Sequence, residues 1–531
     1  MMRSRVVAMA GAVGALVLGA MVVVPGVAGA SSSVLYVAPY GTNGGNSCQS
    51  SSKPCQTISF AVGVAKAGAT IKLQAGTYHE QVAITKPITI SGAGATQSII
   101  APTSEPLSDS DTDSTLPQFY IVDVKGTSGV TLKDVGVSGS SAVTALGNDG
   151  DGCGQDPVGI YFHDASGTLT GDAVSGIELP SGPPEGLFGC QSGQGIYAAT
   201  DSSSSTPSNV TITSTTVGTY QKNGITCDDP RTVCTISKST VTGIGSTPLI
   251  AQNGIQIWAS SATLTSNTVS GNTYDNPDYA ASGILIGNPY LLSASKNVVT
   301  SNDSDIYLIQ DQSPSWVYCG NLTTSCTNPA DSSVAFSFSK NTTSYATNAS
   351  AQPLGTGYGD GLDLDSVTQP TSVVQNVADF DPGNGISLYG AAVVTMDKNT
   401  VAGSGNGIYL GSGTASSTAF LNSLLSNTVT GSQLDGILAD SSSTGNLFET
   451  NNSKGSADFD IQDKSTGTGA EGTANDWSDN TCVTSSPAGL CYTKGGGKRS
   501  LSRRAAAVEA AGLRGAGEAA GGSVSHRLAI R

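Results

Sequence analysis

Positive charge is the scarcest property of this chain of 531 residues. Between Ser31 and Lys494 there are 14 lysines and one arginine, Arg231, against 38 aspartates and glutamates. A surface this acidic cannot follow the phosphates of a nucleic acid, so we expect no nucleic-acid partner. The same balance disfavours a strongly anionic polymer as a ligand, whereas neutral or calcium-bridged glycans fit it better.

Helical periodicity is missing from the body of the chain, and so is any long apolar run after residue 30. The first 30 residues differ: Arg3 and Arg5 precede an apolar stretch over 6–24, and Ala28-Gly29-Ala30 forms a small-residue cleavage signal. This pattern predicts a signal peptide at 1–30 and a secreted, extracellular protein with no membrane span after cleavage. A membrane anchor is the alternative that the length of the apolar stretch leaves open.

Cysteine is present in ten copies, and these fall into pairs that lie close in sequence. Because an oxidising compartment favours disulfide bonds, local pairing is the simplest scheme. Zinc ligation is the rival interpretation, and the spacings and the lack of nearby histidines argue against it. The predicted disulfide bonds join Cys48 with Cys55, Cys153 with Cys190, Cys227 with Cys234, Cys319 with Cys326, and Cys482 with Cys491.

Eight short segments resemble one another and recur at steps of 22 to 29 residues or near-multiples of that unit. Self-similarity at such a period is typical of a solenoid, in which each repeat buries its apolar edge against the next. Alternating apolar and polar residues with Gly, Asn, Ser and Thr punctuation predict short strands. The segments are GIQIW from Gly254, GILIG from Gly283, DIYLI from Asp305, GLDLD from Gly361, GISLY from Gly385, GIYLG from Gly407, GILAD from Gly436 and DFDIQ from Asp458.

A second signature follows several of these strands, as in SNTVSGN around Asn267 and SNTVTGS around Asn427. Asparagine and glycine tolerate the left-handed backbone that a solenoid corner requires, so we expect these residues at the corners. Stacked from coil to coil, their amides can also form hydrogen bonds along the axis. The valines two residues later are expected to point into the core; they are Val269, Val299, Val401 and Val429.

Other segments depart from the strand pattern. Residues 57–68 predict a short helix or turn, and Pro102–Gln118 and Asn148–Gln191 are interpreted as excursions from the stack. The tail at 495–531 has seven basic and two acidic residues, much Gly and Ala, and no strand pattern, which predicts a disordered basic extension.

Through these repeats the chain resembles the right-handed parallel β-helix proteins of the pectin-lyase-like superfamily, over roughly residues 34–491. AGATIKLQAGTYHEQVAITKPITISGAG, at 67–94, resembles the first strands of pectinesterase-like β-helices. GNLFETNNSKGSADFDIQDKS, at 445–465, and NDWSDNTC, at 475–482, resemble the last coils of periplasmic copper-processing β-helix proteins. The resemblance implies an all-β fold, a single-stranded right-handed parallel β-helix at 31–494, and it assigns no reaction.

The repeat pattern also predicts which side chains face outward. Residues one and three positions after the leading Gly or Asp face the core, and those two and four positions after it face out. In GDGLDLD this puts Asp363 and Asp365 on the outer face, with Asp360 at the preceding corner and Asp381 one coil later. Paired carboxylates are the acid and base of glycoside hydrolysis, and aromatic rings beside them suit sugars. The candidate sugar-binding aromatics are Tyr389, Tyr409, Tyr307 and Trp258.

This stretch is loosely similar to the acidic motifs of polygalacturonase-type β-helix hydrolases, but the Gly-His-Gly and Arg-x-Lys elements of that group are absent. The motifs expected of pectate lyases, pectinesterases and alginate epimerases are absent too. Aspartates of this kind also serve as solvated faces and corner caps, and that interpretation stays open. The leading hypothesis is therefore a secreted protein that binds or hydrolyses a polysaccharide; the alternative is a non-catalytic structural or adhesive protein.

His163, beside Asp164 and near Tyr161, is the one histidine placed to act as a general base. We expect no resident cofactor. Calcium is the only ion for which the sequence offers dense oxygen ligands, at 148–151 with Asp156 and at 109–113, and neither stretch completes a known calcium loop. The oligomeric state is not predicted.

Overall fold

The computed structural model describes residues 33–104, 106–109, 116–146, 153–181, 186–275, 280–310, 335–347, 359–413 and 418–492. The predicted signal peptide at 1–30 and the tail at 495–531 lie outside these ranges. Within them the chain is almost entirely strand, as the alternating pattern predicted. The only helices described are α1 (Ile58–Val64), α2 (Ser140–Leu146) and the 3-10 turn η1 (Ala470–Gly472).

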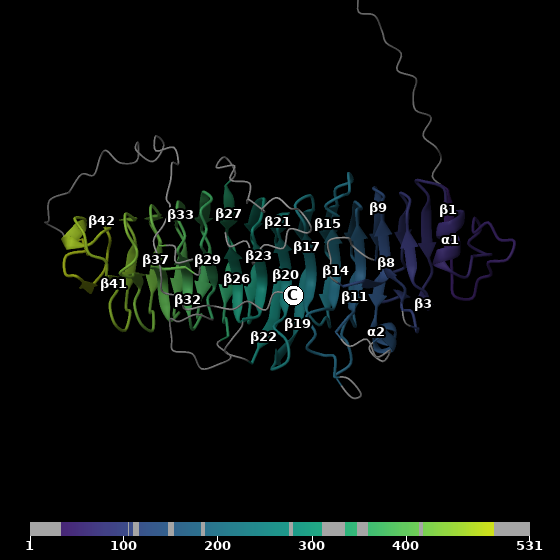
Figure 1. Cartoon of the computed structure of the whole chain (residues 1–531), viewed down its shortest axis with the longest axis horizontal. Helices are drawn as coiled ribbons and strands as arrows, with labels where there is room; N and C mark the ends of the chain where they lie inside the picture. Colours follow the sequence, from purple (N-terminus) through teal and green to yellow (C-terminus); the bar gives the residue numbers. More distant parts are fainter. Residues whose placement is uncertain are drawn as a thin grey trace, which may run out of the picture. The chain divides into compact units, whose positions relative to one another are not determined.

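The strands form three long sheets whose members come from successive coils, so each strand pairs with strands about one repeat away (Figure 1). Every pairing between named strands is parallel except that of β7 with β8. Parallel strands joined in this way by crossovers take the right-handed sense. The chain is a right-handed parallel β-helix, which confirms the predicted fold class.

The first sheet, sheet I, starts the coil. Its strands, in stacking order, are β1 (Val34–Val37), β2 (Thr70–Leu73), β5 (Thr89–Ser91), β9 (Val130–Lys133), β12 (Gly167–Thr170), β15 (Asn209–Thr213), β18 (Val233–Ser237), β21 (Ser261–Thr265), β24 (Leu291–Ser295), β27 (Phe336–Ser339), β30 (Thr371–Val374), β33 (Val394–Asp397), β36 (Ser423–Leu425), β39 (Leu447–Glu449) and β42 (Asp476–Ser478).

Sheet II follows after a tight corner. Its strands are β3 (Gly76–Tyr78), β6 (Ser98–Ile100), β10 (Gly136–Ser138), β13 (Ala173–Ser175), β16 (Thr216–Gly218), β19 (Thr240–Thr247), β22 (Thr268–Tyr274), β25 (Val298–Thr300), β28 (Thr342–Ser344), β31 (Val377–Asp379), β34 (Thr400–Ala402), β37 (Thr428–Thr430) and β40 (Asn452–Lys454).

Sheet III closes the coil and carries the repeat segments. Its strands are β4 (Val82–Ile84), β7 (Ser108–Asp109), β8 (Gln118–Lys125), β11 (Asp156–His163), β14 (Gln194–Ala199), β17 (Asn223–Asp228), β20 (Asn253–Trp258), β23 (Ser282–Gly287), β26 (Ser304–Ile309), β29 (Leu362–Asp365), β32 (Asn384–Tyr389), β35 (Asn406–Gly411), β38 (Ile437–Ala439), β41 (Ile461–Asp463) and β43 (Ser485–Ser486).

The core is one continuous apolar column inside the three sheets. The residues predicted to face inward from sheet III are fully buried there, among them Ile257, Leu308 and Leu364. The valines of the corner signature, Val269 and Val401 among them, lie in the same column. Period-two alternation therefore identified the buried side of each strand correctly.

The corner between sheets I and II differs from its prediction in one respect. The residue in the left-handed region is the one before each asparagine, such as Ser266 (φ 58°) or Lys398 (φ 56°). The asparagine itself turns inward instead and joins a ladder in which Asn399 donates from Nδ2 to Asn427 Oδ1 at 2.9 Å. The expected hydrogen bonding along the axis is confirmed. Assigning the left-handed backbone to asparagine was wrong, because the amide is needed inside, where it pairs buried backbone groups. The glycines of the same signature, such as Gly403 (φ 66°) and Gly431 (φ 62°), do take it, as predicted.

The excursions are also smaller than expected. Residues 156–175 form β11, β12 and β13 of the regular coils, so this part of 148–191 belongs to the stack. The segment 102–118 contains β7, which pairs antiparallel with β8. The helix expected at 57–68 is present as α1, with Thr57 Oγ1 accepting the N–H of Phe60. Nothing in the sequence reasoning anticipated α2.

Four of the five predicted disulfide bonds are formed: Cys48–Cys55, Cys153–Cys190, Cys227–Cys234 and Cys482–Cys491. The fifth is not among the bonds that the structure describes. Both of its members, Cys319 and Cys326, lie outside the described residues, so the bond between Cys319 and Cys326 stays a prediction.

None of the described helices is long and apolar enough to cross a bilayer.

Candidate functional site

The outer face of sheet III carries the predicted site in two columns of side chains. Strand register aligns them coil by coil, at about 4.8 Å per step. Leu362 and Leu364 point into the core, so Asp363 and Asp365 point outward, as predicted. One column contains Tyr307, Asp363, Ser387 and Tyr409; the other contains Ile309, Asp365, Tyr389 and Gly411.

Ser387 links two of the predicted acids. Its Oγ lies 2.7 Å from Asp360 Oδ2 and 3.0 Å from Asp363 Oδ1. Asp360 also accepts the backbone N–H of Asn384 at 2.6 Å. Nδ2 of Asn384 lies 3.2 Å from each carboxylate oxygen of Asp360. Asp360 is therefore surrounded by donors, which stabilise a negative charge.

Asp363 lies in a different environment. Burial, and then the charges of Asp360 and Asp365, raise the pKa of Asp363 well above its usual range. A hydroxyl carries a single hydrogen, so Ser387 cannot donate to two ionised carboxylates at once. A proton on Asp363 resolves this conflict, because Asp363 then donates to Ser387 while Ser387 donates to Asp360.

Asp365 completes the acidic group. Its Oδ1 accepts the hydroxyl of Ser366 at 2.8 Å, and its Oδ2 accepts that of Tyr307 at 3.3 Å. The structure therefore brings together Asp360, Asp363 and Asp365, with Tyr307 of the preceding coil.

Tyr389 and Tyr409 form the aromatic part of the site. Their ring centroids are 5.1 Å apart and the planes are tilted by 51°. Tyr389 accepts a hydrogen bond from Asn384 Nδ2 at 2.9 Å, and Tyr409 donates to Asp440 Oδ2 at 3.2 Å. Burial raises the pKa of both phenols, as do nearby carboxylates, so both stay neutral hydrogen-bonding groups.

The acids are not exposed, although the sequence pattern suggested an open outer wall. Asp363 is 6% exposed, Asp365 3% and Asp360 0%. Only Tyr389 and Tyr409 of this group are partly exposed. Strand alternation determines which side chains point away from the core of the β-helix. Whether other residues bury those side chains depends on the segments that connect the strands, which the repeat pattern does not describe.

Two predicted residues lie apart from this group. Trp258 is in the same column as Asp365, but three coils earlier, about 14 Å along the stack. Asp381 lies at the inner corner between sheets II and III, where its Oδ1 accepts the N–H of Ala346 at 3.1 Å. Burial and the neighbouring Asp305 raise the pKa of Asp381. Neither residue belongs to the hydrogen-bonded group around Asp363 and Ser387.

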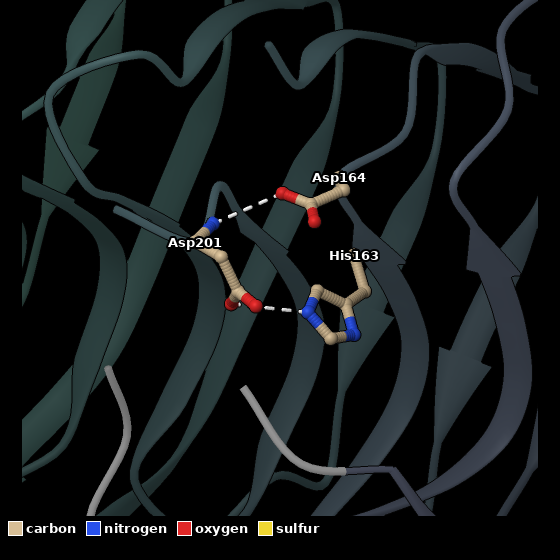
Figure 2. A group of neighbouring side chains, drawn as sticks. All are labelled: His163, Asp164 and Asp201. Atoms are coloured by element: carbon tan, nitrogen blue, oxygen red, sulfur yellow. Dashed lines mark hydrogen bonds and ion pairs between the residues drawn. The ribbon is translucent and has the colours of Figure 1, made fainter. Parts of the chain in front are cut away.

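A second polar cluster surrounds His163, at the end of β11. Its Nδ1 lies 2.7 Å from Asp109 Oδ2. Its Nε2 lies 3.1 Å from Asp201 Oδ1 (Figure 2). Burial lowers the pKa of His163, but the hydrogen bonds and charges of Asp109 and Asp201 outweigh it and raise the pKa to about 9. A doubly paired imidazolium is a poor general base, which argues against the role suggested by sequence.

Sequence reasoning missed the partners that define both clusters. Ser387 was placed in the outward column but given no role, and Asn384 was not considered. Asp109 and Asp201 lie 54 and 38 residues from His163, so no local motif could have connected them. Asn384 directly precedes the leading glycine of its repeat. Comparing this position across the repeats could have identified it.

A search of protein-family models finds no match, and a search of curated proteins finds none either. Among solved structures, the chain is similar to the N-terminal fragment of gene product 12 of bacteriophage Phi29, with a TM-score of 0.48 and 13% identity over 78% of this chain and 65% of that one. It is also similar to the Dettilon tailspike protein gp208, with a TM-score of 0.42 and 13% identity over 80% of this chain and 66% of that one.

A third similar structure is the GH136 lacto-N-biosidase from Eubacterium ramulus, with a TM-score of 0.43 and 12% identity over 85% of this chain and 67% of that one. The chain spans about two thirds of the length of these proteins, and slightly less for gene product 12 and the tailspike protein. Similarity at such identities concerns the fold, so the site has to be interpreted from its own residues.

Proposed function

We propose that this protein binds an extracellular polysaccharide over the outer face of sheet III and hydrolyses it with Asp360, Asp363 and Asp365 as the acid–base set. The observation that carries the proposal is the Ser387 hydroxyl, which joins a carboxyl of raised pKa to a carboxylate surrounded by donors. Two acids whose environments favour opposite protonation states are what glycoside hydrolysis requires.

Asp363 is the proposed general acid. Its raised pKa keeps a proton available at neutral pH for transfer to the oxygen of the leaving sugar. Asp360, charged and held by Asn384, is the proposed base or nucleophile. Asp365, bonded to Tyr307 and Ser366, adds the second negative charge that keeps Asp363 protonated.

Tyr389 and Tyr409 are the proposed sugar contacts. They are the partly exposed members of the group, so we expect a glycan to approach from their side. Aromatic faces pack against the apolar faces of sugar rings, and the surrounding acidic surface favours a neutral glycan over a polyanion. Trp258 is assigned no part in this site because it lies three coils away.

The test is release of reducing ends from a panel of neutral and acidic polysaccharides, with ultraviolet absorbance recorded to detect unsaturated lyase products. We expect D363N to lower the rate by about 10²- to 10⁴-fold, because a general acid contributes that much. Glycan binding should persist in D363N. The matched control D397N, on β33 of sheet I, should leave the rate unchanged.

A non-catalytic structural or adhesive role is the second candidate. The observation in its favour is that the three acids are buried and hydrogen-bonded, as residues that only stabilise a coil would be. Glycan binding without turnover, unchanged by D363N, would identify a binding protein. Absence of both turnover and binding across the panel would reject the carbohydrate proposal.

We also infer that the protein works outside the cytoplasm, with residues 1–30 as a cleaved signal peptide, 31–494 as the β-helix and 495–531 as a loose tail. The four disulfide bonds support this inference, since such bonds persist in oxidising compartments. N-terminal sequencing of the exported protein would test the cleavage site.

A further inference from the structure

The cluster around His163 lies outside the proposed glycan site and combines an imidazole with carboxylates. A ring nitrogen of His163 and carboxylate oxygens of Asp164 and Asp201 all lie within 4.8 Å of one another. Figure 2 shows the two carboxylates and the imidazole around a shared space, contributed by the end of β11 and the turn after β14. Asp164 also accepts the backbone N–H of Asp201 at 3.0 Å, which holds the two segments together.

Negative charge exceeds positive charge around this imidazole. Asp109 and Asp201 contact the ring and Asp164 lies beside it, while Lys125 pairs with Asp109. Asp123, on the neighbouring strand β8, is 3% exposed, and its Oδ1 has no hydrogen-bond partner among the described residues. The nearby cations are the imidazolium, Lys125 and Arg231, whose guanidinium donates to the backbone carbonyl of Asp201, so three positive groups accompany four aspartates.

We propose that His163 Nε2, Asp164 and Asp201 bind a divalent transition-metal ion, with Zn²⁺ the best fit, and that Asp109 orients the imidazole from its other nitrogen. The 3.1 Å between Nε2 and Asp201 Oδ1 is close to the roughly 3.3 Å expected between two ligands of a tetrahedral zinc ion. On binding, His163 releases its Nε2 proton to solvent, so the metal replaces that proton between the same two atoms.

The contact from Asp109 to Nδ1 supports this assignment independently. Histidines that bind metals usually donate the remaining N–H to a carboxylate, which sets the tautomer and increases the basicity of the ligand nitrogen. Asp109 lies 2.7 Å from Nδ1 and belongs to β7, a strand outside the regular coils. A mixed nitrogen and oxygen ligand set favours zinc over calcium or magnesium, which prefer oxygen alone.

The ion would join three segments that are distant in sequence: β7 through Asp109, the end of β11 through His163 and Asp164, and the turn after β14 through Asp201. Its expected effect is stabilisation of the outer face of sheet III in these coils. The site is separate from Asp360 and from the two acids of β29, so its test does not depend on glycan activity.

The experiment uses the full chain, stripped with EDTA and dialysed, and titrates it with ZnCl₂ in a calorimeter while melting curves are recorded with and without the ion. We expect one ion per chain and a rise in Tm of about 3 °C at 100-fold excess over the Kd. CaCl₂ and MgCl₂ should give no comparable rise. No binding of Zn²⁺ by the wild-type chain would overturn the proposal.

Variants locate the ion. D164N and D201N should each weaken Zn²⁺ binding by at least 100-fold, and D109N by about 10- to 100-fold. D134N is the matched control, since Asp134 occupies a corner with the same left-handed backbone (φ 57°, against 51° for Asp164). If D201N does not fold, by circular dichroism, D164N alone decides the outcome. Equal Zn²⁺ affinity in D164N and D134N would overturn the assignment.

Discussion

At the scale of single residues, the leading glycine of each repeat is required by close packing at the corner between sheets II and III. Gly361 illustrates this: a Cβ there would lie 2.7 Å from Gly385 O and 2.7 Å from Thr343 Oγ1, and would also collide with Asp381 Oδ2. Backbone cannot move aside cheaply in a stack held by neighbours on both sides. The recurrence of glycine in the repeat thus reflects lack of space for a Cβ, since Gly361 is not among the glycines with a positive φ.

We therefore expect Gly361→Ala to lower the free energy of unfolding by about 2 to 3 kcal/mol, through overpacking against fixed backbone. Chemical denaturation followed by circular dichroism would measure it. Gly44→Ala is the control, because a Cβ at Gly44 meets nothing within 4 Å. Equal stability of the two variants would show that the coil relaxes around the added methyl group.

At the scale of elements, the corner between sheets I and II is held by a continuous ladder of asparagine side chains. Each Oδ1 accepts the backbone N–H and Nδ2 of the preceding asparagine, and each Nδ2 reaches back to a carbonyl of sheet I. The ladder thereby pairs buried backbone N–H and C=O groups that a turn at the end of a strand otherwise leaves to water. The members are Asn267, Asn297, Asn341, Asn376, Asn399, Asn427, Asn451 and Asn480.

Asn399→Ala should destabilise the protein by about 3 kcal/mol or more. It removes the partner of three groups, namely the N–H and Nδ2 of Asn376 and the carbonyl of Val373, and each buried unpaired group costs about 1 to 3 kcal/mol. Oδ1 of Asn427 keeps the backbone N–H of residue 399. The measurement is a urea titration. Thr395→Ala, an exposed position on the neighbouring strand β33, should stay within about 0.5 kcal/mol of wild type. A loss no larger than that of the control would mean that water replaces the ladder.

At the scale of the whole molecule, the buried acids give the fold an unusual pH dependence. Burial raises the pKa of several aspartates, to about 7 for Asp123, Asp172 and Asp303 and to about 6 for Asp156. The folded state therefore binds more protons than the unfolded state between about pH 4 and 7, so stability falls as pH rises through this window. Lys222 acts in the opposite direction, since burial lowers its pKa to about 7.

Four carboxyls outweigh one lysine, so we expect the Tm to be about 5 °C higher at pH 5 than at pH 8. The net charge of −16 adds to the difference, since self-repulsion weakens as the carboxylates are neutralised. Scanning calorimetry in EDTA-containing buffers would measure it. Asp172→Asn should reduce the difference, while Asp397→Asn should not. A Tm that rises from pH 5 to pH 8 would contradict the assigned protonation.

Much of the architecture was determined locally and could be predicted. Alternation assigned Leu364 to the core and Asp363 to the opposite side, spacing assigned four disulfide pairs now seen, and the repeat predicted stacked coils. These features depend on strand geometry and short loops, which act over a few residues. The left-handed backbone belongs to the residue before each corner asparagine, one position earlier than predicted. The asparagine amide instead forms hydrogen bonds with buried carbonyls that only the folded corner presents.

The site depended on relations that no short stretch contains. The neighbouring coils and the segments that connect them determine whether Asp363 is buried and whether Asp381 turns inward. They also determine that Asp109 and Asp201 meet at His163. Stacking brings residues roughly 20 to 60 positions apart to about 4.8 Å, and the number of inserted residues determines which ones meet. The sequence by itself determined a β-helix and its buried side, and the tertiary structure alone decided which outward groups share a proton, a partner or an ion.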